Sequence, residues 1–181
     1  ISGIQSVHWT KEMDTLLRPL IIESEHIYLN TNEHLRAPDI VETRDMRFLR
    51  WCRQTFPLHH YERVAPILNK LRAVKSPAEI ELIKSAVGIT EKAFRRLLGF
   101  IKPGVWEYEI EAEIVHEFMR NRSRGPAYET IVASGIDACT LHYVKNDKQC
   151  QEGDVVLIDF GAEYAHYAAD VTRTLPVSGR F

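Results

Sequence analysis

The sequence predicts an α+β protein in which long helices precede a small sheet. Within residues 75–122 the apolar side chains recur every three to four positions, which is the period of an amphipathic helix. Within residues 129–177 the period changes to that of strands, and valine, isoleucine, threonine and tyrosine become frequent. Helices followed by strands are typical of the α+β class, whereas α/β proteins alternate the two.

The first part of the chain, residues 1–70, has weaker patterns. They predict helices over residues 10–20, 44–56 and 61–74, and a short strand over residues 26–30. A polar stretch at residues 31–34 follows the strand, and Pro57 separates the second helix from the third. This part is therefore expected to mix helix and strand.

A helix start signal marks the second part of the chain. Ser76 stands at the N-cap position, Pro77 in the first turn and Glu79 three residues after the cap, which is the pattern of a capping box. The helix ends at the Pro-Gly pair of residues 103–104, and a second helix is predicted over residues 107–122. Strands are then predicted over residues 129–134, 154–162 and 164–177.

The charge balance excludes several classes of partner. The chain carries 23 lysines and arginines against 25 acids, so its net charge of -2 gives no long-range field for nucleic acid or an anionic membrane. No apolar run approaches the roughly 20 residues that span a bilayer. We expect a globular chain that binds neither nucleic acid nor membrane.

The cysteine pattern favours a reducing, cytoplasmic setting. The 3 cysteines are odd in number and lack the close paired spacing of a zinc ribbon or a secreted disulfide framework. Cys139 stands just before His142 and can be considered as a nucleophile. A cysteine without further signals is more often a small buried hydrophobe, so we expect Cys139 to be buried and not to be a nucleophile.

Two aspartates in strand-like segments are the first candidates for chemistry. Residues 155–160 are apolar enough for a buried strand, where the carboxylate of Asp159 is costly unless something compensates its charge. Asp170 lies in a second short strand and has the same problem. A hairpin centred between Tyr164 and Ala165 would place the two aspartates opposite each other, with Cβ atoms about 5 Å apart.

Such a pair of carboxylates has two explanations. At this distance one must take up a proton unless a cation lies between them, and it could bridge two divalent metals roughly 3.5 to 4 Å apart. Oxygen donors alone favour manganese over thiolate-seeking metals. Alternatively, Asp159 caps the hairpin through backbone hydrogen bonds and Asp170 pairs with Arg173. The spacing leaves both explanations open, and no nearby residue has an obvious claim to complete a metal site.

Five motifs in the second part are specific enough to identify a family. They are L-R-A-V-K-S-P-A-E-I at residues 71–80, Y-E-T-I-V-A-S-G at 128–135, L-H-Y at 141–143 with Asn146, G-D-V-V-L-I-D-F-G at 153–161 and Y-A-A-D-V-T-R-T-L-P-V at 167–177. Residues 71–181 closely resemble the first half of the catalytic domain of Xaa-Pro aminopeptidases (aminopeptidase P). These enzymes share the pita-bread fold with methionine aminopeptidase, prolidase and creatinase. The resemblance implies the N-terminal half of a pita-bread domain.

The resemblance also implies a role for each candidate residue. Asp159 and Asp170 correspond to two aspartate ligands of a pair of divalent metals, usually manganese, with Asp170 bridging both. His142 corresponds to a substrate-site histidine that interacts with the peptide and with the tetrahedral intermediate, and not with the metals. The metals activate the water that hydrolyses the bond between an N-terminal residue and a following proline.

The same resemblance implies that the chain is a fragment. In the family, a glutamate general base and the remaining ligands, one histidine and two glutamates, come from the second half of the domain, which lies beyond Phe181. We therefore expect the isolated chain to be inactive, and we expect the two metal ions in the complete enzyme rather than in this chain alone. Residues 1–70 fit the tail of the α/β, creatinase-type N-terminal domain, which aminopeptidase P and prolidase have and methionine aminopeptidases lack. The complete protein is expected to be a homo-oligomer, either a dimer or a tetramer.

Two positions depart from the family pattern. His166 stands where relatives often have glycine in the hairpin turn, and Phe160 stands where a small residue is common. Histidine tolerates a left-handed turn better than most residues do. The remaining histidines are expected to be structural or exposed: His8, His26, His34, His59, His60 and His116.

Three functions are compatible with the sequence. The first is a cytoplasmic, manganese-dependent Xaa-Pro aminopeptidase that acts on proline-containing peptides. The second is prolidase, which shares the metal residues but prefers dipeptides with a C-terminal proline. The third is a non-catalytic module of the same fold that binds a peptide or protein. Such modules usually lack the aspartates that this chain retains at Asp159 and Asp170.

Overall fold

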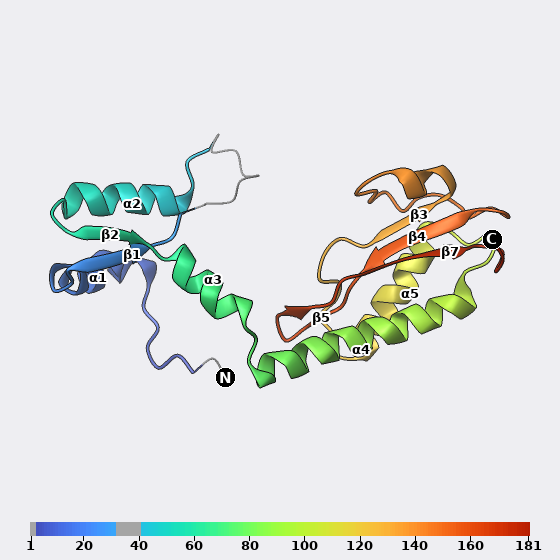
Figure 1. Cartoon of the computed structure of the whole chain (residues 1–181), viewed down its shortest axis with the longest axis horizontal. Coiled ribbons are helices and arrows are strands. Elements are labelled where there is room, and N and C mark those ends of the chain that lie inside the picture. Colours follow the sequence, from blue (N-terminus) through green and yellow to red (C-terminus); the bar gives the residue numbers. More distant parts are fainter. Residues whose placement is uncertain (1–2, 32–40) are drawn as a thin grey trace. The chain divides into compact units, whose positions relative to one another are not determined.

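The computed structural model describes residues 3–31 and 41–181 (Figure 1). The chain divides into two compact units, Ile1–Val74 and Lys75–Phe181. The boundary expected after residue 70 lies a few residues before this division. In the second unit long helices precede a small antiparallel sheet, so the predicted α+β class is confirmed. None of the described helices combines the length and the apolar character that a bilayer span requires.

The first unit combines helices with a two-stranded parallel sheet. Its elements are a 3-10 turn at Thr10–Glu12, α1 at Met13–Ile22, β1 at His26–Leu29, α2 at Arg44–Thr55, β2 at His60–Arg63 and α3 at Ala65–Ala73. The helix predicted over residues 61–74 is wrong at its start, because Tyr61 lies in β2. The Tyr61 hydroxyl donates to the carbonyl oxygens of Cys52 and Phe56, and β2 pairs with β1. Contacts distant in sequence therefore decide the structure here.

The helices of the second unit are the two that the sequence predicts. α4 spans Pro77–Phe100, and its capping box is formed. The Ser76 N–H donates to the Glu79 carboxylate at 2.7 Å, and the Glu79 N–H donates to the Ser76 hydroxyl at 3.3 Å. These bonds satisfy N–H groups that have no partner within the first turn, which fixes the start of the helix. α5 spans Glu107–Arg120.

The sheet of the second unit is antiparallel, with the strand order β3-β4-β7. The strands are β3 at Ile131–Ser134, β4 at Val155–Phe160, β5 at Glu163–Tyr164, β6 at Tyr167–Ala168 and β7 at Val171–Pro176. β5 and β6 form a separate hairpin, which lies between β4 and β7 in the sequence. The single strand predicted over residues 164–177 is therefore divided, and Asp170 lies between β6 and β7.

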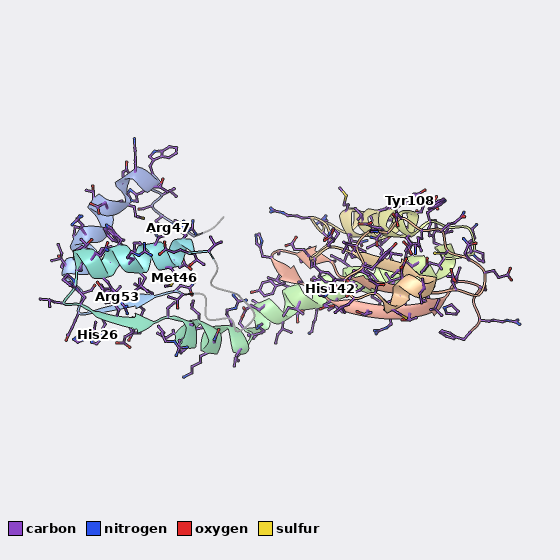
Figure 2. All side chains as sticks on the ribbon, turned by 90° about the horizontal axis from the view of Figure 1, so that it is seen from above. His26, Met46, Arg47, Arg53, Tyr108 and His142 are labelled. Carbon is purple, nitrogen blue, oxygen red and sulfur yellow. The ribbon has the colours of Figure 1, made fainter. Side chains whose placement is uncertain are left out.

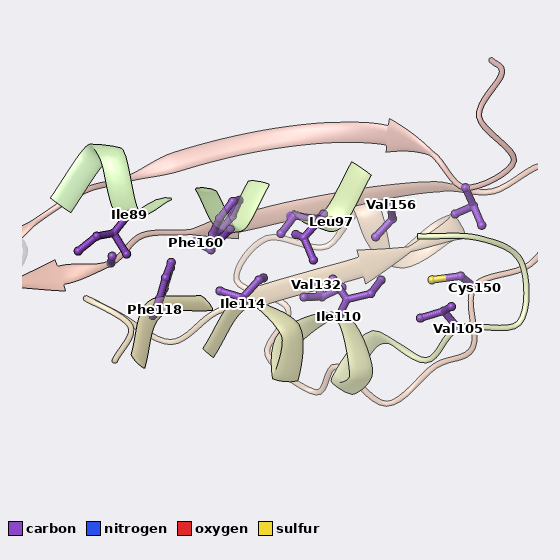
Figure 3. Close-up of a cluster of buried hydrophobic side chains, with 14 residues drawn as sticks. Ile89, Leu97, Val105, Ile110, Ile114, Phe118, Val132, Cys150, Val156 and Phe160 are labelled. Atoms are coloured by element: carbon purple, nitrogen blue, oxygen red, sulfur yellow. The ribbon is translucent and has the colours of Figure 1, made fainter. Parts of the chain in front are cut away.

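The two faces of this sheet have different surroundings. One face, here called the core face, packs against α4 and α5 in a continuous apolar cluster (Figure 3). The cluster includes Ile89, Ala93 and Leu97 of α4, Ile110, Ile114 and Phe118 of α5, Val132 of β3, and Val156, Ile158 and Phe160 of β4. The opposite face, here called the open face, carries Ile131, Leu157 and Asp159, and Leu157 and Asp159 are partly exposed. The buried strand expected over residues 155–160 is therefore found, but only its core face is fully buried, and Asp159 lies on the partly exposed side.

Candidate functional site

A cavity of about 520 Å³ lies on the open face, beside the end of β4. It is lined by Tyr128, Glu129, Ile131, His142, Val144, Asp159 and Asp170. The structure thus brings together the three residues that the sequence singles out as candidates, His142, Asp159 and Asp170. They come from a loop, a strand and the link between two strands, so the cavity is assembled from segments that are separate in the sequence.

Asp159 reaches the cavity from β4 and Asp170 from the link before β7, and the two are not in opposed positions. Asp159 pairs with Thr172 across the β4–β7 ladder. The expected hairpin centre is one residue too early, because Ala165 and His166 form the turn with left-handed φ values of 50° and 69°. Asp170 comes two residues before Thr172 and is thus a diagonal neighbour of Asp159, a relation in which side chains lie about 7 Å apart.

Gly161 allows the chain to pass close to its partner strand beside Asp170. A Cβ atom on Gly161 would lie 1.8 Å from the carbonyl oxygen of Ala169, so a larger residue does not fit unless the backbone moves. The Ala169 N–H donates to the carbonyl oxygen of Ala162 at 3.0 Å, which holds the two segments together. This close approach lies at the end of the β4–β7 ladder and sets the position of Asp170.

Tyr128 joins the two aspartates; it begins the motif of residues 128–135, but no role was predicted for it from the sequence. Its hydroxyl lies 2.7 Å from Asp159 Oδ1 and 3.0 Å from Asp170 Oδ1. Burial, and then the hydrogen bonds to both aspartates, raise the pKa of this hydroxyl far above its ordinary value, so it remains a donor at neutral pH. A hydroxyl has one hydrogen, so Tyr128 can donate to only one of the two carboxylates at a time. The other carboxylate then receives no hydrogen bond from Tyr128.

The aspartate pair fits a divalent cation as two ligands, and not as a complete site. Carboxylate oxygens are the ligands that hard cations prefer. A cation would also balance the negative charge of the two carboxylates, which the single hydrogen bond from Tyr128 does not neutralise. Across residues 3–31 and 41–181, no three histidine, cysteine, aspartate or glutamate side chains are grouped to hold a metal ion. The alternative pairing of Asp170 with Arg173 is not what the structure has, since Arg173 Nη1 donates to the carbonyl oxygen of Thr172 at 2.7 Å.

His142 lines the cavity with an exposed side chain, at the edge toward solvent, and lies in the loop between β3 and β4. Figure 2 labels this residue. Its side chain is exposed, which leaves the ring free to meet a ligand. Its backbone is left-handed, with a φ of 54°. Histidine adopts this conformation more readily than most residues other than glycine do, but it still costs free energy that the surrounding contacts must supply. The loop is therefore held in place by its neighbours.

Two other groups of residues considered from the sequence do not line the cavity. Cys139 ends the 3-10 helix η2, Gly135–Cys139, and is exposed, so the expectation that it is buried is wrong. The loop that follows β3 carries it away from the apolar cluster. His60 stacks on His26 with ring centroids 5.3 Å apart, which is a structural role as expected. His34 lies outside the described residues.

Comparison with known families matches residues 81–181 to metallopeptidase family M24. Among the relatives, Xaa-Pro aminopeptidase of Haemophilus influenzae is 48% identical over 116 residues, which are 64% of this chain and 27% of that protein. Xaa-Pro aminopeptidase of Escherichia coli is 47% identical over 64% of this chain and 26% of its own length. Xaa-Pro dipeptidase of Pyrococcus horikoshii is 32% identical over 80% of this chain and 41% of its own length. The chain thus spans about a quarter of the length of the two aminopeptidases.

Solved structures give the same result for the fold. An Escherichia coli aminopeptidase P variant in complex with substrate has a TM-score of 0.80 and 36% identity, and the match covers 99% of this chain and 41% of that one. Proline aminopeptidase P II from Yersinia pestis has a TM-score of 0.80 and 34% identity, over 94% of this chain and 39% of that one. The pita-bread fold expected from the sequence is thereby confirmed for the part of the domain that the chain spans.

Proposed function

The chain belongs to metallopeptidase family M24, and from this premise we propose that the protein containing it is a metal-dependent Xaa-Pro aminopeptidase. Such an enzyme releases the N-terminal residue of a peptide whose second residue is proline. The observation that carries the proposal is the cavity in which Asp159 and Asp170 share one tyrosine hydroxyl while His142 lies at the edge. The names of the bacterial relatives support the substrate class.

In this proposal Asp159 and Asp170 are ligands of two divalent metal ions, which we take to be manganese. When bound, such ions supply Lewis acidity toward the scissile carbonyl and make a coordinated water more acidic. The chain itself holds the two carboxylates at a fixed separation, through β4, the close approach at Gly161 and the Tyr128 hydroxyl. The remaining ligands are proposed to come from the part of the protein outside this chain.

The proposed roles of Tyr128 and His142 follow from their chemistry. The Tyr128 hydroxyl lies within hydrogen-bond distance of both carboxylates, so in this proposal it orients the aspartates as a donor. The exposed His142 ring can donate a hydrogen bond to a peptide carbonyl oxygen at the cavity edge. Neither residue replaces the general base, which we also place outside this chain.

The decisive test is Asp170→Asn in the complete protein. We expect the manganese-dependent release of the N-terminal residue from an Xaa-Pro tripeptide to fall by more than about a hundredfold, because changes to outer partners of metal ligands alone cost about 10- to 100-fold. The circular dichroism spectrum should not change. Asp14→Asn is the matched control, because Asp14 is exposed on α1 and pairs with Arg18. Retained activity in the Asp170 variant would refute the proposal.

A prolidase is the second candidate, and one observation favours it. The dipeptidase relative from Pyrococcus horikoshii aligns with a larger share of this chain than the bacterial aminopeptidases do. Rates on an Xaa-Pro dipeptide and on a longer Xaa-Pro peptide separate the two candidates. Faster cleavage of the longer peptide identifies the aminopeptidase, and cleavage restricted to the dipeptide identifies the prolidase.

The cellular setting and the assembly stay predictions. The cysteine pattern favours the cytoplasm, and the family resemblance favours a dimer or tetramer. Sedimentation of the complete protein measures the second of these directly.

A further inference from the structure

Glu107 is a carboxylate with no exposed surface, at the first residue of α5. It does not line the cavity, and the proposed reaction gives it no role. A buried carboxylate is costly unless hydrogen bonds replace the water it has lost. The hydrogen-bond partners of Glu107 therefore indicate its role.

The donors to Glu107 fill both of its oxygens. Oε1 accepts from the Ser134 N–H and from the Ser134 hydroxyl, each at 2.7 Å. Oε2 accepts from the Tyr143 hydroxyl at 2.9 Å and from the Lys148 N–H at 3.0 Å. A carboxylate has about four lone-pair sites, and these donors reach all of them, with the Tyr143 hydroxyl sharing its one hydrogen between Glu107 and Asp147 Oδ1, which lies 3.1 Å away.

All of these donors belong to one segment of the chain. We call residues 135–148 the His142 loop. Ser134 precedes the loop at the end of β3, Tyr143 follows His142 directly, and Lys148 ends the loop. One side chain on α5 therefore ties together the start, the middle and the end of the loop that carries His142.

Asn146 fastens the same loop to β3 from a second point. Its Oδ1 accepts from the Val132 N–H at 2.9 Å, and its Nδ2 donates to the Thr130 carbonyl oxygen at 2.9 Å. Nδ2 also donates to Glu111 Oε2 at 2.9 Å. Because Asn146 anchors the loop to the sheet, loss of the Glu107 contacts should loosen the middle of the loop without detaching all of it.

We propose that Glu107 is a positioning residue, which acts on the reaction by holding His142 in its left-handed conformation at the cavity edge. The proposal rests on the proposed peptidase function. It is distinct from a general packing role, because the packing of α5 is provided by Ile110, Ile114 and Phe118 in the apolar cluster. The contacts of Glu107 go instead to the His142 loop and its two ends.

The test is a double-mutant cycle in the complete protein, with Glu107→Gln and His142→Ala separately and together. Glutamine has nearly the size of glutamate, but its NH₂ group faces donors and cannot accept from them. We expect Glu107→Gln to lower kcat on an Xaa-Pro tripeptide by about 10- to 100-fold, as for other residues that orient a functional side chain. In the His142→Ala background the same change should have no further effect. An equal loss in both backgrounds would show that Glu107 acts on the fold in general and would overturn the proposal.

Hydrogen exchange of the same variants gives a readout that does not depend on activity. Glu107→Gln should accelerate amide exchange in residues 135–148 while leaving α4 and β4 unchanged. Unchanged exchange in this loop overturns the proposal even if activity falls. If the wild-type protein proves to have no peptidase activity but the loop is loosened, the proposed function fails and Glu107 remains a clamp for the loop.

Two further variants keep the test informative if Glu107→Gln folds poorly. Tyr143→Phe removes one hydrogen-bond donor to Glu107. It should lower kcat and accelerate amide exchange in residues 135–148 in the same way, but by a smaller amount. Glu117→Gln is the matched control on the same helix, because Glu117 is only 8% exposed but contacts Asn121 and Arg96 rather than the loop. An effect of Glu117→Gln on the loop equal to that of Glu107→Gln would also contradict the proposal.

Discussion

The core face and the open face of the sheet belong to the same strands and serve different purposes. On the core face, Ile158 and Phe160 have no exposed surface and pack in an apolar cluster, where contacts are not directional. On the open face, Asp159 is partly exposed and is held by a hydrogen bond from Tyr128. The comparison teaches that the two-residue period of β4 lets one strand supply stability on one side and chemical groups on the other.

Gly161→Ala should have the largest effect, because Gly161 is buried against the backbone of Ala169, just after β4. The new Cβ would lie 1.8 Å from the Ala169 carbonyl oxygen, so the backbone must move. We expect a loss of about 3 kcal/mol in the free energy of unfolding, the upper range for an overpacked site. Urea unfolding measures it.

Gly99→Ala is the control for that change. Gly99 lies in α4, and a Cβ atom there would meet no atom within 4 Å. Alanine is a better helix former than glycine, so this variant should gain roughly 0.5 to 1 kcal/mol. If both variants change stability in the same direction, the close approach at Gly161 does not have the role given to it here.

Tyr128→Phe tests the open face alone. The variant removes the hydroxyl that Asp159 and Asp170 share and leaves the apolar cluster intact. We expect the manganese concentration for half-maximal activity of the complete protein to rise about tenfold, the lower range for an outer partner of metal ligands. Tyr108→Phe is the control, because Tyr108 is exposed on α5. An unchanged manganese requirement would show that Tyr128 does not organise the aspartates.

Glu79→Gln should have the smallest effect, and the effect should depend on pH. Hydrogen bonds from the Ser76 N–H and then from the Tyr167 hydroxyl lower the pKa of Glu79 from its ordinary value of 4.5. A lowered pKa in the folded state adds stability above the unfolded pKa, and this contribution is lost as the pH falls through the folded pKa. The difference in melting temperature between wild type and variant should therefore be larger at pH 7 than below pH 4.5.

Glu81→Gln is the control for loss of charge on the same helix. Glu81 is exposed and pairs with Lys84. If the two variants show the same dependence on pH, the hydrogen bonds of Glu79 are not its cause.

The helices of the second unit could be predicted because their signals are local. The capping box at Ser76 and Glu79 and the apolar period of α4 and α5 involve residues within a few turns of one another. The candidate site was predicted in part. His142, Asp159 and Asp170 line one cavity, but their roles come from the family resemblance and stay predictions.

The remaining features depend on contacts between distant residues. The start of the third predicted helix is β2, because Tyr61 packs against α2 and pairs with β1. The partner of Asp159 is Thr172, because the left-handed residues at the hairpin turn set a register that alternation alone cannot fix. Tyr128 and Glu107 were missed for the same reason, since their partners lie on other elements.

The edge strand β7 has a further consequence, for aggregation during synthesis. Within the described part of the chain β7 pairs with β4 alone, so its other edge presents backbone groups that a second chain could pair with. Arg173 places a positive charge on this strand, and Pro176 lacks the N–H that a new ladder would need. The sequence of β7 thus opposes edge-to-edge association in the interval before its neighbours have folded.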